Sequence, residues 1–272
     1  MDKMKHSYFL SLVAVGLAAL GNPLLAHAAD TNPSTTNKWE SSIAAGATLT
    51  RGNSETFLGT ISAGTGKKWN QNELAFGADV AYGTTTTETK VTTDPGPPPV
   101  TKTVKSTDTT AETMHAFGQY NRLFNERLYG LGRIEGLHDG VADIDYRLSF
   151  NVGAGYYFIK NKETQLSAEV GPGYLVQRLG GDNQSYATLR LGDKFNQALS
   201  DRARLWQTAE ILPQVDDFNN FIVNFEIGIE ADLNSSKKLA LRVYLDDTYN
   251  NVPAAGRKKN DMKLVAAVAY KF

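Results

Sequence analysis

The chain of 272 residues contains no cysteine. This absence excludes a disulfide framework, thiolate metal sites and the lipidated cysteine that anchors a lipoprotein. Uncompensated charge is also scarce, because 28 Lys and Arg side chains stand against 29 Asp and Glu side chains, giving a net charge of −1. A nucleic-acid-binding protein carries a basic surface, so we expect no nucleic-acid partner.

Long hydrophobic runs are absent after the N-terminus. Beyond the first thirty residues, no apolar stretch approaches the ~20 residues that a membrane-spanning helix needs. At the N-terminus, two lysines precede an apolar run from Tyr8 to about Leu20, and a small-residue Ala26-His27-Ala28 site follows. This order is typical of a secretory signal peptide. We therefore expect residues 1–28 to be cleaved and residues 29–38 to form a polar periplasmic leader.

What the remaining chain, 39–272, does contain is apolar residues at every second position. In 145–159, for example, the even positions are apolar or aromatic, whereas the odd positions include Asp145, Arg147, Ser149 and Asn151. A strict period of two predicts a β-strand with one apolar and one polar face. About twelve such segments are found: 39–50, 56–69, 73–83, 110–122, 127–137, 145–159, 164–177, 185–198, 203–213, 220–233, 238–249 and 261–272.

The connections between these segments alternate in length. Short turns are expected at 70–72, 123–126, 160–163, 199–202 and 234–237, and longer loops at 51–55, 84–109, 138–144, 178–184, 214–219 and 250–260. This alternation is typical of the periplasmic turns and extracellular loops of outer-membrane barrels. Most segments also exceed the ~9–11 residues of a membrane-spanning strand. The sequence predicts an all-β fold, a closed antiparallel transmembrane β-barrel of about 12 strands; a soluble sandwich or lipocalin-like barrel is the alternative.

The last twelve residues, DMKLVAAVAYKF, support this prediction. Met262, Leu264, Val268, Tyr270 and Phe272 share one apolar face of an extended strand. An aromatic residue at the carboxyl terminus resembles the closing strand of bacterial outer-membrane barrels, which the barrel-insertion machinery reads. We expect that machinery as a partner through Phe272, and outer-membrane lipid and lipopolysaccharide as surroundings. The expected location is the bacterial outer membrane.

Four stretches resemble the YdiY-like family, whose members are described as salt-induced outer-membrane proteins with a domain of unknown function. These stretches are WESSIAAGATLTRGNSET at 39–56, IDYRLSFNVGAGYYF at 144–158, AEVGPGYLVQ at 168–177 and KNDMKLVAAVAYKF at 259–272. The resemblance implies a barrel, an outer-membrane location and a link to salt or osmotic stress. It implies no substrate and no catalytic residue. The chain departs from the family mainly in the longer, repetitive 84–109 segment.

One cluster of acidic residues beside a histidine could have a catalytic or metal-binding role. His138 is followed by Asp139, with Asp143 and Asp145 nearby, at an expected extracellular rim. A histidine beside carboxylates can act as a general base, and the alternative function is therefore a rim hydrolase of lipase or protease type. A divalent cation bound by these carboxylates is a further hypothesis, and acidic residues in a solvated loop are the simplest interpretation. We assign no catalytic, cofactor or metal residue and expect no cofactor.

Four other motifs are interpreted structurally. RGNSE at 51–55 is typical of a turn, and Gly171-Pro172-Gly173 predicts a bulge or bend in its strand, because proline donates no ladder hydrogen bond. The Thr-rich 84–109 segment, with PGPPP, predicts a disordered or polyproline-like extracellular loop; folding inward as a constriction is its alternative. The basic residues 257–259 suit lipopolysaccharide phosphates or a solvated loop equally.

The predicted inward faces carry more acids than bases. The expected set is Glu40, Glu73, Asp79, Glu169, Glu226, Glu230, Asp232 and Asp246 against Arg147, Arg190, Lys194, Arg242 and Lys263, with His115 as a lumen or interface residue. Barrels of about eight strands fill their interior and those of sixteen leave a channel. The sequence predicts a non-enzymatic barrel, either a narrow passive pore for ions or small solutes, with weak cation preference if water fills it, or an envelope component linked to salt stress.

Overall fold

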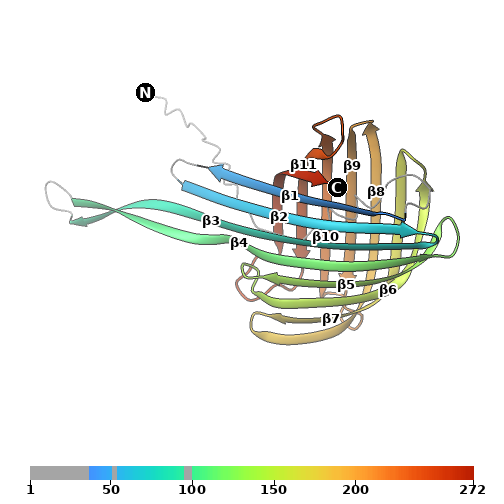
Figure 1. Ribbon diagram of the computed structural model, residues 1–272. Coiled ribbons are helices and arrows are strands. Elements are labelled where there is room, and N and C mark those ends of the chain that lie inside the picture. Colours follow the sequence, from blue (N-terminus) through green and yellow to red (C-terminus); the bar gives the residue numbers. More distant parts are fainter. Residues whose placement is uncertain (1–36, 51–53, 95–99) are drawn as a thin grey trace, which may run out of the picture.

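The computed structural model describes residues 37–50, 54–94 and 100–272 as one closed barrel of twelve antiparallel strands (Figure 1). The predicted fold class and strand number are confirmed. The expected signal peptide, most of the leader and the Arg51-Gly52-Asn53 part of the RGNSE motif lie outside the described residues. The strands are β1 Trp39–Thr50, β2 Ser54–Trp69, β3 Asn72–Asp94, β4 Val100–Leu123, β5 Leu128–Asp139, β6 Ile144–Lys160, β7 Thr164–Leu179, β8 Asp182–Ser200, β9 Ala203–Pro213, β10 Phe221–Asp232, β11 Leu239–Asn250 and β12 Asn260–Lys271.

The period of two separates the two faces of the wall. On β6, Leu148 and Val152 point outward and are 41% and 62% exposed. Ser149 and Asn151, which lie between them in the sequence, point inward and are buried. The polar side chains therefore fill the inside, and the apolar ones cover the outside. This is the reverse of a water-soluble globular protein, and it suits a wall surrounded by hydrocarbon.

Asn side chains close three connections at one end of the barrel, called here the turn end. Asn161 Oδ1 accepts the backbone N–H groups of Glu163 and Thr164 at 2.9 and 2.7 Å. Asn125 and Asn234 accept backbone N–H groups in the β4–β5 and β10–β11 connections in the same way. Asn favours turns because its side chain satisfies local backbone donors. The opposite end is called the loop end.

Gly180 and Gly181 form the β7–β8 connection at the loop end, where a longer loop was expected. Both have positive φ, +58° and +85°, which glycine adopts without steric cost. The two flanking strands therefore extend to Leu179 and Asp182 and leave only these two residues between them. The expected 178–184 loop is wrong for this reason.

The prediction of disorder is also wrong for the described parts of 84–109. Residues 84–94 and 100–109 prolong β3 and β4 into a two-stranded ribbon that projects far beyond the barrel (Figure 1). Residues 95–99, the PGPPP motif, lie outside the described residues. Thr86 and Thr107 hydrogen-bond across the ribbon at 2.8 Å, and Lys105 pairs with Glu88 at 2.5 Å. Thr is β-branched and favours extended backbone, so low apolar content here produces a solvent-exposed ladder rather than disorder.

Gly171-Pro172-Gly173 does not form a bulge in β7, so that part of the prediction is wrong. The β7–β8 register continues through the motif, with Pro172 opposite Leu189. Toward β6, the register is the same on both sides, from Asn151↔Gly173 to Ala154↔Val170. The β6–β7 ladder is interrupted at Pro172 and Gly171, where proline has no N–H to donate. Gly171 lets the two backbones approach closely at this point.

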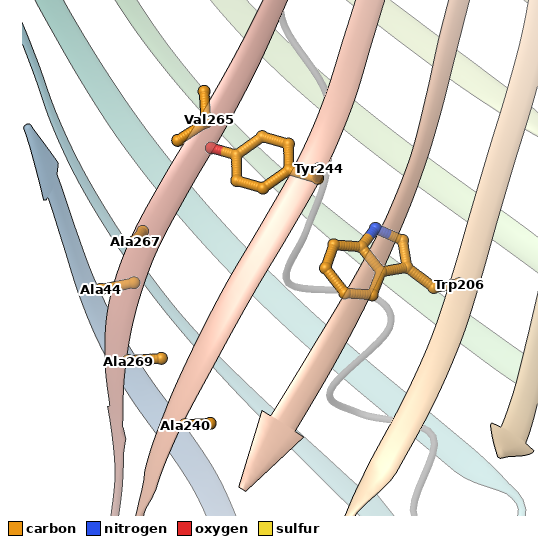
Figure 2. Packing of buried hydrophobic residues seen from close by; sticks show 7 residues of the cluster. All are labelled: Ala44, Trp206, Ala240, Tyr244, Val265, Ala267 and Ala269. Atoms are coloured by element: carbon orange, nitrogen blue, oxygen red, sulfur yellow. The ribbon is translucent and has the colours of Figure 1, made fainter. Parts of the chain in front are cut away.

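The β1–β12 seam closes the barrel near the turn end. Ser41 and Phe272 exchange two backbone hydrogen bonds, at 2.9 and 3.1 Å, and five residue pairs follow from Ser42↔Lys271 to Gly46↔Ala267. Small buried residues line the inner side of the seam, and Trp206 and Tyr244 cover the adjoining strands (Figure 2). Among the described residues no helix is long and apolar enough to cross a membrane.

Candidate functional site

The charged residues of the lumen form the candidate site. Every member of the predicted inward set shares its strand face with buried side chains or lines an inner cavity, and His115 also faces inward, 3% exposed. The alternation of inward and outward residues along each strand was enough to assign these side chains to the lumen. The structure also shows which of these charged side chains contact one another.

Glu169 on β7 is the centre of the largest group. Its carboxylate pairs with Arg190 Nη1 at 2.7 Å and with Lys194 Nζ at 2.8 Å, both from β8. It also accepts hydrogen bonds from the Tyr129 hydroxyl at 2.9 Å and the Gln119 amide at 3.2 Å. Glu169 is 3% exposed. A carboxylate so deeply buried requires this many partners, since its desolvation is costly.

His115 on β4 links two neighbouring strands. Its ring nitrogens lie 2.9 Å from Asp79 on β3 and 2.9 Å from Glu135 on β5. Glu135 also pairs with Arg133 at 2.7 Å, and the Arg133 guanidinium lies over the Phe117 ring, 4.6 Å from its centroid. This group occupies the wall beside the Glu169 group.

A third group surrounds Glu230 on β10. Arg242 on β11 donates to it at 2.7 Å, Arg204 on β9 at 3.0 Å, and Lys271 on β12 at 3.0 Å. Lys271 also pairs with Asp232 at 2.6 Å. Arg204 and Lys271 are about a quarter exposed, whereas Arg242 and Glu230 are almost fully buried. The group therefore passes from a buried inner part to a hydrated outer part.

Two carboxylates lie opposite each other between these groups. Glu226 on β10 is paired in register with Asp246 on β11, and both are buried. Asp246 contacts Lys263 at 3.1 Å, and Glu226 accepts the indole N–H of Trp206. Acids and bases are thus mixed around the middle of the lumen, with these two carboxylates as neighbours.

Glycines make room for the two large inward aromatics. Tyr129 is paired with Gly155 and Trp206 with Gly228 across neighbouring strands. A side chain at either glycine would overlap the facing ring. Each aromatic ring therefore lies flat against a neighbouring strand, where it reaches its carboxylate partner, Glu169 or Glu226.

The lumen opens at the turn end into a cavity of about 530 Å³. Its lining is polar and of mixed charge, and it includes Glu40, Gln165, Arg204, Asp232 and Lys271. A smaller space of about 60 Å³ lies between the Glu169 group and Glu73. Water and small polar solutes can therefore enter from the turn end as far as the ion-pair groups.

A segment between β11 and β12, residues 251–259 and called here the strap, covers the loop end. Ala254 is buried and packs with Ile144 and Leu179, at the loop-end termini of β6 and β7 on the other side of the barrel. Asn251 anchors the strap by donating to the Asn219 carbonyl at 2.7 Å. The strap thus crosses the loop-end opening.

Among the described residues, the His138 ring contacts no carboxylate of the proposed rim hydrolase. His138 and Asp139 follow each other on β5, so their side chains leave opposite faces. The His138 ring contacts the backbone carbonyl of Asp145 at 2.9 Å, whereas Asp139 is buried inside and accepts the N–H of Ala142. Nor does the described part of the chain hold a cluster of three or more His, Asp or Glu residues suited to a metal ion.

Several lumen residues were not singled out from the sequence. These are Arg133, Glu135, Trp206, Arg204 and Glu210. All lie at inward positions of strands that were predicted, so the period of two was the available signal. Their alternation is weaker because the outward residues beside them include Gly132, Gly136 and Gln207, which are not typical of a lipid-facing surface.

Comparison with known proteins adds a family. The family described as "Protein of unknown function, DUF481" matches residues 43–272, and this description names neither salt induction nor a substrate. The comparison with curated proteins gives no match.

Solved outer-membrane structures are distantly similar. A NanC porin has a TM-score of 0.45 and 6% identity, covering 85% of this chain and 97% of that one. The translocator domain of the autotransporter NalP from Neisseria meningitidis has a TM-score of 0.44 and 15% identity, covering 92% of both chains. The channel DcaP of Acinetobacter baumannii has a TM-score of 0.40 and 9% identity, covering 86% and 95%. At such distances the barrel is established by this chain's own strand pairing.

Proposed function

The chain belongs to the DUF481 family, and we propose that it is a narrow, non-enzymatic outer-membrane channel for ions and small polar solutes, closed in this conformation. One observation carries the proposal: an apolar wall encloses a charged lumen that is open at the turn end and covered by the strap at the loop end. A purely structural barrel has no need of a hydrated cavity beside a ring of charges.

The same wall supports the proposed outer-membrane location. Its exposed side chains are apolar on nearly every strand, and aromatic residues lie near strand ends, including Tyr156, Phe158, Tyr270 and Phe272. Aromatic girdles of this kind suit the two membrane interfaces. In outer-membrane barrels short turns lie in the periplasm, so the cavity opens to the periplasm and the strap and ribbon face outward.

Ion pairs in the lumen offer a physical basis for the response to salt that the family resemblance implies. Arg204 and Lys271 are partly hydrated where they hold Glu230. Dissolved ions screen such exposed pairs within about 8–10 Å at physiological ionic strength, whereas the buried Glu169 group is screened much less. Rising salt would therefore loosen the periplasmic side of the constriction first.

Single-channel recording in planar bilayers tests the proposal. The folded wild-type protein is expected to give rare, small conductance steps. A variant in which residues 252–258 are replaced by two glycines should give larger or longer openings, because the strap no longer covers the loop end. If neither protein conducts, although both are folded and inserted, the channel proposal is wrong.

A further inference from the structure

β1 and β12 are paired along only part of the seam. The ladder ends at Gly46↔Ala267, yet β1 continues to Thr50 and β12 begins at Asn260. By contrast, β1 pairs with β2 over twelve positions and β11 with β12 over eleven. Figure 2 shows β1 close to β12 near Ala44 and turning away from it toward the loop end. Residues 47–50 and 260–266 therefore form the two edges of a gap in the wall.

Two exposed leucines lie on the edges of this gap. If the register of the seam continued, Leu49 would lie opposite Leu264. Instead these two leucines are 74% and 66% exposed, whereas outward Leu148 on β6 and Leu241 on β11 are 41% and 39% exposed. Cross-strand neighbours normally cover each other. In the described part of the chain, neither Leu49 nor Leu264 has a cross-strand neighbour from the strand across the gap.

An open edge within the wall has a cost in hydrocarbon. Backbone N–H and C=O groups that face lipid without a partner cost several kcal/mol each, by general estimates for membranes. Whatever lies in the gap must offer apolar chain to Leu49 and Leu264 and also hydrogen-bonding groups to the two backbone edges.

Charge beside the gap specifies the occupant further. Arg257, Lys258 and Lys259 are exposed in the strap immediately before β12 begins, at the loop-end mouth of the gap. Such a basic group attracts phosphate. A second copy of the chain fits poorly, because a two-fold seam-to-seam contact would bring both basic groups together, and like charges across an interface repel.

We propose that the gap is a lateral binding site for an anionic lipid of the surrounding leaflet, with its phosphate at residues 257–259 and an acyl chain between β1 and β12. The lipid class that fits carries hydroxyl or amide groups where its acyl chains begin, because these can hydrogen-bond the strand edges that β1 and β12 do not pair with each other. The inference depends on the membrane location in the proposed function and is independent of conduction.

Photocrosslinking tests the site. A p-benzoylphenylalanine is placed at Leu264 and, in a matched control, at Leu148, because each is the fifth residue of a strand that starts at the loop end. The folded proteins are reconstituted in phosphatidylcholine vesicles containing lipid A as a minor component, irradiated and analysed by mass spectrometry. Lipid A is expected to form a several-fold larger share of the adducts at Leu264 than at Leu148.

The triple variant R257S/K258S/K259S should reduce that share to the value found at Leu148. An equal share at both positions in the otherwise wild-type protein would overturn the lipid site, and so would crosslinked dimers as the main product at Leu264. If Leu148 itself gives no lipid adducts, the membrane location fails along with the site. Failure at Leu264 alone leaves the proposed channel intact.

Discussion

Lys194 on β8 donates a hydrogen bond to the side-chain oxygen of Gln119 on β4 at 3.3 Å, although three strands separate β8 from β4 around the wall. Tyr157 on β6 similarly reaches Glu73 on β3 at 3.4 Å. Twelve strands allow a wider interior than eight. Here long charged and aromatic side chains meet across that interior and narrow it from within.

Neutralising the Glu169 carboxylate should destabilise the barrel strongly. Glu169→Gln leaves the partly buried Lys194 without its counter-ion and removes one of the two acidic partners of Arg190. Breaking a buried pair by changing one partner costs about 3–5 kcal/mol. Denaturant unfolding in lipid vesicles measures the loss, and Glu163→Gln, in the exposed β6–β7 turn, is the control that should change little. Equal stabilities would refute the role of Glu169 as the centre of its group.

A side chain at Gly228 should displace Trp206. Gly228→Val places methyl groups where the indole ring lies, and overpacking of this kind costs about 1–3 kcal/mol. Gly132→Val is the matched control, because a Cβ at Gly132 meets no atom within 4 Å. Tryptophan fluorescence should shift only for the Gly228 variant. An unchanged spectrum and stability would show that Trp206 does not lie against that strand.

Removing the carboxylate of Asp193 should stabilise the protein. Asp193 points outward from β8, pairs in register with Ala209 near the middle of β9 and lies in an otherwise apolar outer hollow. Charges on the lipid face cost up to about 2–4 kcal/mol at the membrane midplane, and acids cost less than bases. Asp193→Leu should therefore raise the unfolding free energy by about 1 kcal/mol or more, whereas Asp201→Leu in the β8–β9 turn should not. A loss of stability would indicate that the carboxylate has a partner in the membrane.

Conductance should rise more steeply with salt than the conductivity of the solution. The partly exposed pairs of Glu230 with Arg204 and Lys271 weaken when ions screen them. Lys271→Gln should flatten this dependence, because the hydrated part of the group is then already broken. Recording the open-channel current over a series of KCl concentrations checks the slope. A conductance strictly proportional to conductivity in both proteins would contradict a salt-sensitive constriction.

The sequence was most informative where each strand face has a single environment. Period-two alternation located β6 and β10 to within one residue at each end and sorted Arg147, Glu226 and Asp246 inward, because lipid and lumen impose opposite polarity on neighbouring residues. The sequence was least informative where both faces of a strand are exposed to water. The Thr-rich part of β3 and β4 has no alternation, so nothing distinguished its ladder from a disordered loop.

Contacts within the lumen could not be predicted in this way. Parity shows that Lys194 and Gln119 both point inward, but whether they meet depends on the girth of the barrel and the shear of its strands. The strap likewise depends on one small residue, Ala254, fitting between Ile144 and Leu179. No sequence period encodes such a contact between distant segments.

The central claim is that every second residue of the wall faces lipid. Because the chain has no cysteine, single cysteines can be placed along β6 at Leu148, Ser149, Phe150, Asn151 and Val152 and labelled with an environment-sensitive fluorophore. In vesicles of brominated lipid, we predict strong quenching at the three even positions and weak quenching at the two odd ones. Equal quenching along the strand, or none at all, would contradict a barrel whose apolar face is covered by the membrane.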